Sequence, residues 1–121
     1  GGKRAILNYG HTLAHAIETA GAYDLRHGEA VAIGIRYAAE IARRLGRIID
    51  DRVAEHERVL AAYKLPTTVP EQLTDAELMN LFSRDKKAID GVTFVLDGPN
   101  GVETVVGVDP EVLAASFAAV R

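Results

Sequence analysis

Three of the four histidines of this chain lie close together near its start, at His11, His15 and His27. His11 and His15 are four residues apart, so on a helix their side chains share one face and converge on one site. Neutral imidazole is the most common metal ligand among side chains, and it is also a natural general base near neutral pH. The segment therefore predicts a metal site or an acid–base site.

Two glutamates, Glu18 and Glu29, lie near these histidines in the sequence. Two histidines and a carboxylate can bind zinc and leave one position open for catalysis. The pattern is not the HExxH zinc helix, because Thr12 stands where a glutamate would follow the first histidine. A single histidine is more often packed or solvated than bound to a metal, and the pattern alone leaves that structural interpretation open. Three histidines close together, beside Gly10 and Gly28, make a functional site as well supported by the pattern as a structural role.

A second charged group, SRDKK at residues 83–87, combines an arginine with two lysines. Such cations are favourable at the solvated C-terminal end of a helix. They could also form a clamp for a phosphate or a carboxylate. The chain has neither a GxGxxG motif nor a Walker loop. A nucleotide site of its own is therefore not expected.

The overall composition excludes several classes of function. The net charge is −3 and charged residues make up 26%, so no basic face for nucleic acid is expected. The absence of cysteine excludes disulfides and thiolate metal sites, and no apolar stretch is long enough to span a membrane. We expect a cytoplasmic protein. His56, in the charged run EHER at residues 55–58, is predicted to be a solvated surface residue.

Two helices are expected to position the clustered histidines. The first covers residues 12–20, and Gly21 ends it. The second covers residues 28–45, because its apolar positions recur with a period near 3.6, and Gly46 ends it. The second helix is rich in alanine and glycine, which let neighbouring helices approach closely. It is therefore predicted to be the central helix of a bundle.

Two further helices follow. The first of them opens at Asp50 or Asp51, either of which can cap it, and ends before Pro66. The next opens at Thr74, whose spacing from Glu77 is that of a capping box.

The spacing of the apolar residues then changes near the C-terminal end of the chain. The β-branched runs at residues 92–96 and 102–106, joined by turn residues, predict a hairpin. A last helix begins at Asp109, with Pro110 at its first position. The predicted fold class is therefore mainly α, a helical bundle domain with a small β-hairpin near the C-terminus.

Two motifs resemble those of the 3-dehydroquinate synthase family: LNYGHTLAHAIE at residues 7–18 and RHGEAV at residues 26–31. The RDKK run at residues 84–87 is similar to a segment of that family and lies at the expected distance ahead of the hairpin. The likeness covers nearly the whole chain. It implies that residues 1–121 are the C-terminal metal- and substrate-binding helical domain, and that the N-terminal NAD-binding domain lies outside this chain.

The resemblance also implies an activity. Members of the family are lyases of the shikimate pathway, which leads to chorismate and the aromatic amino acids. They convert 3-deoxy-D-arabino-heptulosonate 7-phosphate to 3-dehydroquinate and phosphate, with recycled NAD and a divalent metal, zinc or another such as cobalt. A substrate hydroxyl is transiently oxidised, phosphate is eliminated, the carbonyl is reduced again and the ring closes by an aldol reaction. The resemblance further implies a sugar-phosphate acid as substrate, a full-length homodimer, and no nucleic acid or membrane as partner.

For the metal, the resemblance implies that His11 and His27 are ligands and that a glutamate of the N-terminal half is the third. It makes His15 an acid–base histidine, or one that supports the ligands, near the phosphate of the substrate. Helical spacing alone would instead give both His11 and His15 to the metal. We follow the family pattern, because the third ligand and the substrate fill the remaining directions.

For the substrate, the resemblance implies contacts from Arg4 and Asn8. Lys86 or Lys87 would pair with the substrate carboxylate and take part in catalysis, and the likeness does not separate the two. It places no cofactor-binding residue in this chain, so the 121 residues alone are expected to be inactive and to bind zinc weakly. One departure is Ala14, where many members have glycine.

Three other functions are considered. Related NAD- and zinc-dependent cyclases make aminodehydroquinate, deoxy-scyllo-inosose or valiolone-type products and differ at substrate contacts. Metal-dependent alcohol or glycerol dehydrogenases share the helical architecture and the histidine ligands, but would accumulate NADH and need no cationic clamp. A non-catalytic helical binding domain is the third.

Overall fold

The computed structural model describes residues 9–21, 23–84 and 93–121. Its elements, in chain order, are α2 (His11–Ala20), α3 (His27–Arg44), α4 (Asp50–Ala62), α5 (Asp75–Ser83), β1 (Phe94–Leu96), β2 (Glu103–Val105), α6 (Pro110–Ser116) and the short 3-10 helix η1 (Phe117–Val120). The two strands pair antiparallel, with Val95 opposite Thr104. The fold is therefore mainly α with a small hairpin, as predicted. Within these ranges, no helix is both long and apolar enough to cross a membrane.

Helix ends that depend on a local side chain were predicted correctly. The hydroxyl of Thr74 accepts a hydrogen bond from the backbone N–H of Glu77 at 3.2 Å, and Asp109 caps α6 in the same manner. The predicted aspartate cap of α4 is wrong, because Ile49 is the N-cap and makes no side-chain cap bond. Asp50 lies in the first turn instead, where its charge interacts favourably with the helix dipole.

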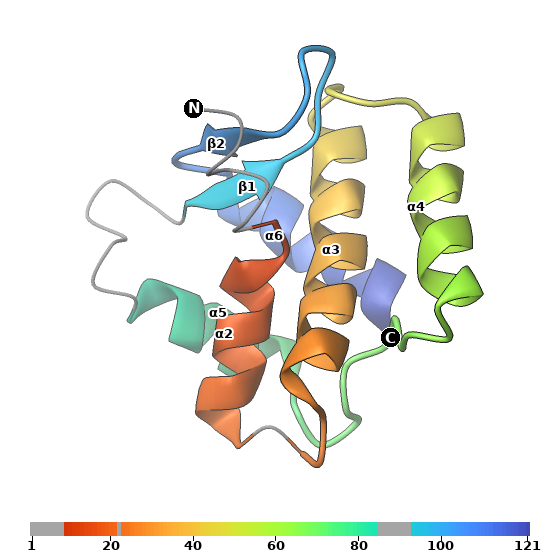
Figure 1. The fold of residues 1–121 in the computed structure, drawn as a ribbon. Coiled ribbons are helices and arrows are strands. Elements are labelled where there is room, and N and C mark those ends of the chain that lie inside the picture. The colour runs from red at the N-terminus through yellow and green to blue at the C-terminus, as the bar shows by residue number, and fades with distance from the viewer. Residues whose placement is uncertain (1–8, 22, 85–92) are drawn as a thin grey trace.

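Helix α3 lies in the middle of the molecule, with α2 and α4 on either side and α6 behind it (Figure 1). Its Tyr37 is fully buried and stacks on Phe117 with ring centroids 4.8 Å apart. The Tyr37 hydroxyl donates to the carbonyl oxygen of Leu113 at 2.8 Å. The predicted central helix is therefore confirmed, and one hydrogen-bonded aromatic group joins it to the C-terminal elements.

The backbones of α2 and α3 touch where two glycines face each other. A Cβ atom added to Gly34 would lie 1.9 Å from the carbonyl oxygen of Gly10. Gly10 itself has φ of +80°, a left-handed conformation that favours glycine. This contact fixes the start of α2, and with it His11, against the side of α3.

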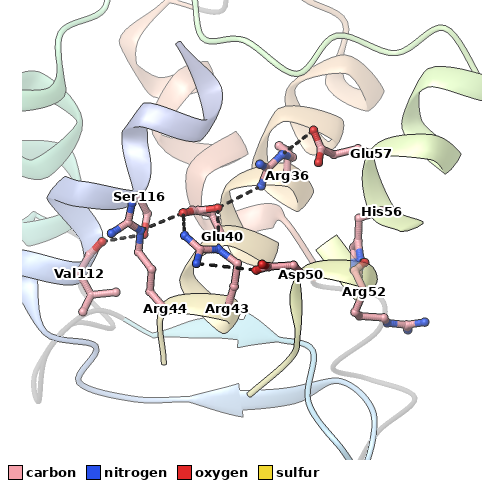
Figure 2. A network of polar contacts seen from close by, with 10 residues as sticks. All are labelled: Arg36, Glu40, Arg43, Arg44, Asp50, Arg52, His56, Glu57, Val112 and Ser116. Carbon is pink, nitrogen blue, oxygen red and sulfur yellow. Dashed lines mark hydrogen bonds and ion pairs between the residues drawn. The ribbon is translucent and has the colours of Figure 1, made fainter. Parts of the chain in front are cut away.

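A buried acid, Glu40, holds a group of arginines on α3 (Figure 2). Its carboxylate accepts hydrogen bonds from Arg43 at 2.6 Å and from Arg44 at 2.9 Å. Arg36 lies 3.6 Å from the same carboxylate and 3.6 Å from Glu57 on α4. The cluster is therefore part of what joins α3 to α4.

The charge state of Glu40 gives a testable dependence on pH. Burial by itself raises the pKa of Glu40, but the hydrogen bonds and charges of Arg43, Arg44 and Arg36 together lower it below its usual value. A carboxyl whose pKa falls on folding stabilises the fold above its unfolded pKa of about 4.3, and loses this effect as the pH falls through the folded pKa. We expect Glu40→Gln to lower the free energy of unfolding by about 1–3 kcal/mol at pH 7.

Urea denaturation at pH 7 and at pH 3 measures this difference. The difference in free energy of unfolding between the wild type and Glu40→Gln should narrow at pH 3, because this carboxyl is protonated in the unfolded chain there, whereas its pKa is lower in the folded protein. Glu57→Gln is the matched control: its carboxylate is half exposed, so its loss should change stability by less than about 1 kcal/mol. If Glu40→Gln lowers the free energy of unfolding equally at pH 7 and at pH 3, the lowered pKa of Glu40 in the folded protein is contradicted.

Candidate metal and substrate site

The first residue of α2 and the first residue of α3 bring two imidazoles together. The ring centroids of His11 and His27 lie 5.6 Å apart, with their planes inclined by 28°. The short connection after Gly21 lets the two helices run antiparallel side by side (Figure 1). The packing of α2 on α3 thus brings together the imidazole rings of His11 and His27, which belong to different helices.

Of the two nearby glutamates, Glu18 contacts the ring of His27, whereas Glu29 contacts the backbone at the start of α3. Both carboxylate oxygens of Glu18 lie 3.1 Å from Nδ1 of His27. The side chain of Glu29 accepts a hydrogen bond from the backbone N–H of Arg26 at 2.8 Å. Glu29 therefore caps the start of α3, whereas Glu18 interacts with the His27 ring.

His15 lines a separate pocket on α2. This pocket has a volume of about 170 Å³, and its polar wall is formed by Thr12, His15, Thr19 and Arg84. Arg84 is the C-cap residue of α5 and is the first cation of the RDKK run. The residues lining the pocket thus include an imidazole and a guanidinium, two groups that can bind an anion, whereas the Thr12 hydroxyl donates to the carbonyl oxygen of Thr93 at 2.9 Å.

The prediction that His56 is a solvated surface residue is wrong. Only 10% of its side chain is exposed. Its Nδ1 donates to the carbonyl oxygen of Arg52 at 2.8 Å, and the hydroxyl of Tyr9 donates to its Nε2 at 2.8 Å. The charged neighbours of His56 hid a periodic signal, because Val53, His56 and Leu60 share the inner face of α4.

Tyr9 and the buried Asp97 were missed by the sequence analysis. Burial first, and then the negative charge of Asp97, raise the pKa of Tyr9 above its usual value. Tyr9 therefore remains a hydrogen-bond donor to His56 at neutral pH. Because Tyr9 lies two residues before His11, this bond ties the entry of α2 to α4.

A family profile described as 3-dehydroquinate synthase C-terminal matches residues 1–88. The chain belongs to the 3-dehydroquinate synthase C-terminal family. It is 49% identical over 112 residues to a protein of Amycolatopsis mediterranei named as an aminodehydroquinate synthase, covering 93% of this chain and 32% of that protein. It is 45% identical over 119 residues to the 3-dehydroquinate synthase of Saccharopolyspora erythraea, covering 96% and 32%. The chain thus spans about a third of the length of these relatives.

Solved structures of related cyclases have the fold of this 3-dehydroquinate synthase C-terminal domain. A 2-deoxy-scyllo-inosose synthase, solved with carbaglucose-6-phosphate, NAD⁺ and Co²⁺, is 26% identical with a TM-score of 0.79, covering 93% of this chain and 34% of that one. A 2-epi-5-epi-valiolone synthase from Streptomyces hygroscopicus, solved with NAD⁺ and Zn²⁺, is 21% identical with a TM-score of 0.76, covering 92% and 31%. The second likeness shows the fold alone.

The structure therefore places three of the residues assigned from the family motifs. His11 and His27 are in ring contact, and His15, one helical turn after His11, lines the pocket that also contains Arg84. The other four assigned residues lie outside the described ranges: Arg4, Asn8, Lys86 and Lys87. Among the residues that the structure does describe, no three histidine, aspartate or glutamate side chains are grouped to hold a metal ion. In the described part of the chain, His11 and His27 thus form a pair of imidazole rings in contact.

Proposed function

We propose that the full-length protein containing this chain is a 3-dehydroquinate synthase. It would convert 3-deoxy-D-arabino-heptulosonate 7-phosphate to 3-dehydroquinate and phosphate, as a homodimer in the cytoplasm. The observation that carries the proposal is the meeting of His11 and His27 between α2 and α3, beside the pocket of His15. The named 3-dehydroquinate synthases among its relatives support the same reaction.

The two imidazoles fit a divalent metal. With each ligating nitrogen about 2.0–2.1 Å from zinc, two rings on one ion have centroids roughly 5–6 Å apart. The rings of His11 and His27 are 5.6 Å apart, and imidazole accepts either zinc or cobalt. His11 and His27 would hold the metal, with a third ligand from outside this chain. When bound, the metal would polarise substrate oxygens and NAD would accept and return a hydride.

The remaining residues of the site would handle charge and protons. Arg84, together with Lys86 or Lys87, would hold the anionic groups of the substrate in one pose, which lowers the entropic cost of reaction. His15 lies in the same pocket as Arg84. Its imidazole would exchange a proton with the substrate near its phosphate during elimination.

A second candidate is aminodehydroquinate synthesis. It is favoured by the relative of that name, at 49% identity. Both reactions use a carboxylate substrate, and Arg84, the cation of the RDKK run that the structure describes, would bind either one.

Phosphate release by the full-length protein tests the proposal. The assay supplies 3-deoxy-D-arabino-heptulosonate 7-phosphate, catalytic NAD and zinc, with the amino analogue of the substrate in parallel. We expect rapid phosphate release from the first substrate without accumulation of NADH, and none from the isolated 121-residue chain. Release from the amino analogue alone would select the second candidate, and accumulation of NADH would point to a dehydrogenase.

A further inference from the structure

We propose that Glu18 is a positioning residue for the metal site, acting through the ring of His27. Its carboxylate accepts a hydrogen bond from Nδ1 of His27 and so presents Nε2 of that ring to the metal. The inference rests on the proposed function, because it assumes that His11 and His27 share a metal ion.

The first support is the geometry of the contact. Each carboxylate oxygen of Glu18 lies 3.1 Å from Nδ1 of His27, which is hydrogen-bond distance. Glu18 follows His11 by seven residues on α2, so the Cα atoms of these two residues are about 10.5 Å apart along the helix axis. His27, at the start of α3, nevertheless contacts both residues. The histidine thus lies between the glutamate and the other proposed ligand.

The second support is the chemistry of imidazole. A neutral ring carries one proton, and an ionised carboxylate can only accept a hydrogen bond. The contact with Glu18 therefore places the proton of His27 on Nδ1, which leaves the lone pair on Nε2 for coordination. Carboxylates bound in this way fix the tautomer and orientation of metal-binding histidines and raise their basicity.

The solvent exposure of Glu18 and His27 distinguishes a role in metal binding from a role in folding stability. The side chain of His27 is 66% exposed and that of Glu18 is 37% exposed. Ion pairs in such surroundings contribute little to folding stability. Loss of Glu18 should therefore weaken metal binding while leaving the thermal stability of the metal-free protein nearly unchanged.

The test measures cobalt binding by the full-length protein. The apparent dissociation constant comes from competition with a chelator, and the visible spectrum of Co²⁺ reports its ligand set. We expect Glu18→Ala to weaken binding by about 10–100-fold, the usual cost of losing such a partner. Glu18→Gln should keep most of the affinity, because its amide oxygen still accepts the Nδ1 proton. Glu29→Gln is the matched control, since it removes the same charge nearby while a glutamine can still cap the helix.

Each outcome has a distinct meaning. Unchanged affinity in Glu18→Ala, with normal binding by the wild type, overturns the role of Glu18 and leaves the proposed function intact. A Glu18→Gln variant that binds as weakly as Glu18→Ala, with an altered cobalt spectrum, would make Glu18 a direct ligand and also overturn the inference. A wild type that binds no cobalt removes the proposed metal site and this inference together.

Discussion

Gly34→Ala is expected to lower the free energy of unfolding by about 3–5 kcal/mol, among the largest effects of any single substitution. The new Cβ would lie 1.9 Å from the oxygen and 2.8 Å from the carbonyl carbon of Gly10. Both atoms belong to the backbone, so no side-chain rotation can relieve the overlap. The start of α2 must move away from α3, which also opens the tight packing beside the site.

Urea denaturation of the chain, followed by circular dichroism, measures this loss. Gly28→Ala is the matched control, because a Cβ at Gly28 meets no atom within 4 Å. Since Gly28 lies in α3, alanine there should leave the stability unchanged or raise it by up to about 1 kcal/mol. A Gly34→Ala variant as stable as Gly28→Ala would show that α2 and α3 are not held as close as the structure indicates.

Local chemistry explains which parts of the fold could be predicted from the sequence. Thr74 and Asp109 cap their helices through their own side chains, and such bonds depend only on residues two or three positions away. Helix α4 begins at Asp50, one of the two residues predicted for its start, but its N-cap is Ile49, which makes no side-chain bond. A cap of that kind leaves no signal in the sequence.

The misjudged residues are those whose environment is set by contacts far along the chain. Tyr9, whose hydroxyl donates a hydrogen bond to His56, lies 47 residues away from it in the sequence. Nothing in the charged run around His56 indicates that partner. Asp97 lies in the loop after β1 and approaches His56 and Arg52 only in the folded chain. The sequence shows only the neighbours of these residues along the chain. It therefore predicts a surface position for His56 and a turn for Asp97, because their spatial neighbours come together only on folding.

The same limitation applied to the histidines. Helical spacing favoured His11 and His15 as a pair, whereas the structure brings the rings of His11 and His27 together. Their contact depends on the antiparallel packing of α2 on α3 and thus on Gly10 and Gly34. The family motifs carry that information implicitly, and periodicity does not.

Substitution of the paired histidines is expected to remove the metal. In the full-length protein, we expect His11→Ala and His27→Ala each to weaken zinc binding by more than about 100-fold, because a lost ligand costs more than the 10–100-fold of a supporting partner. Phosphate release should fall with the metal content. Metal analysis after dialysis, together with the phosphate assay, measures both effects.

His15→Ala is the informative comparison, because His15 lies on the same face of α2 as His11 but lines the pocket that also contains Arg84. We expect this variant to keep its zinc and to release phosphate about 10²–10⁴-fold more slowly, the usual cost of losing an acid–base group. Loss of zinc in His15→Ala with retention in His27→Ala would instead favour the pair at helical spacing. A metal bound by that pair would lie along one face of α2, and the contact between His11 and His27 would then be packing at the start of α3. The two outcomes therefore distinguish a site formed between two helices from a site on one helix.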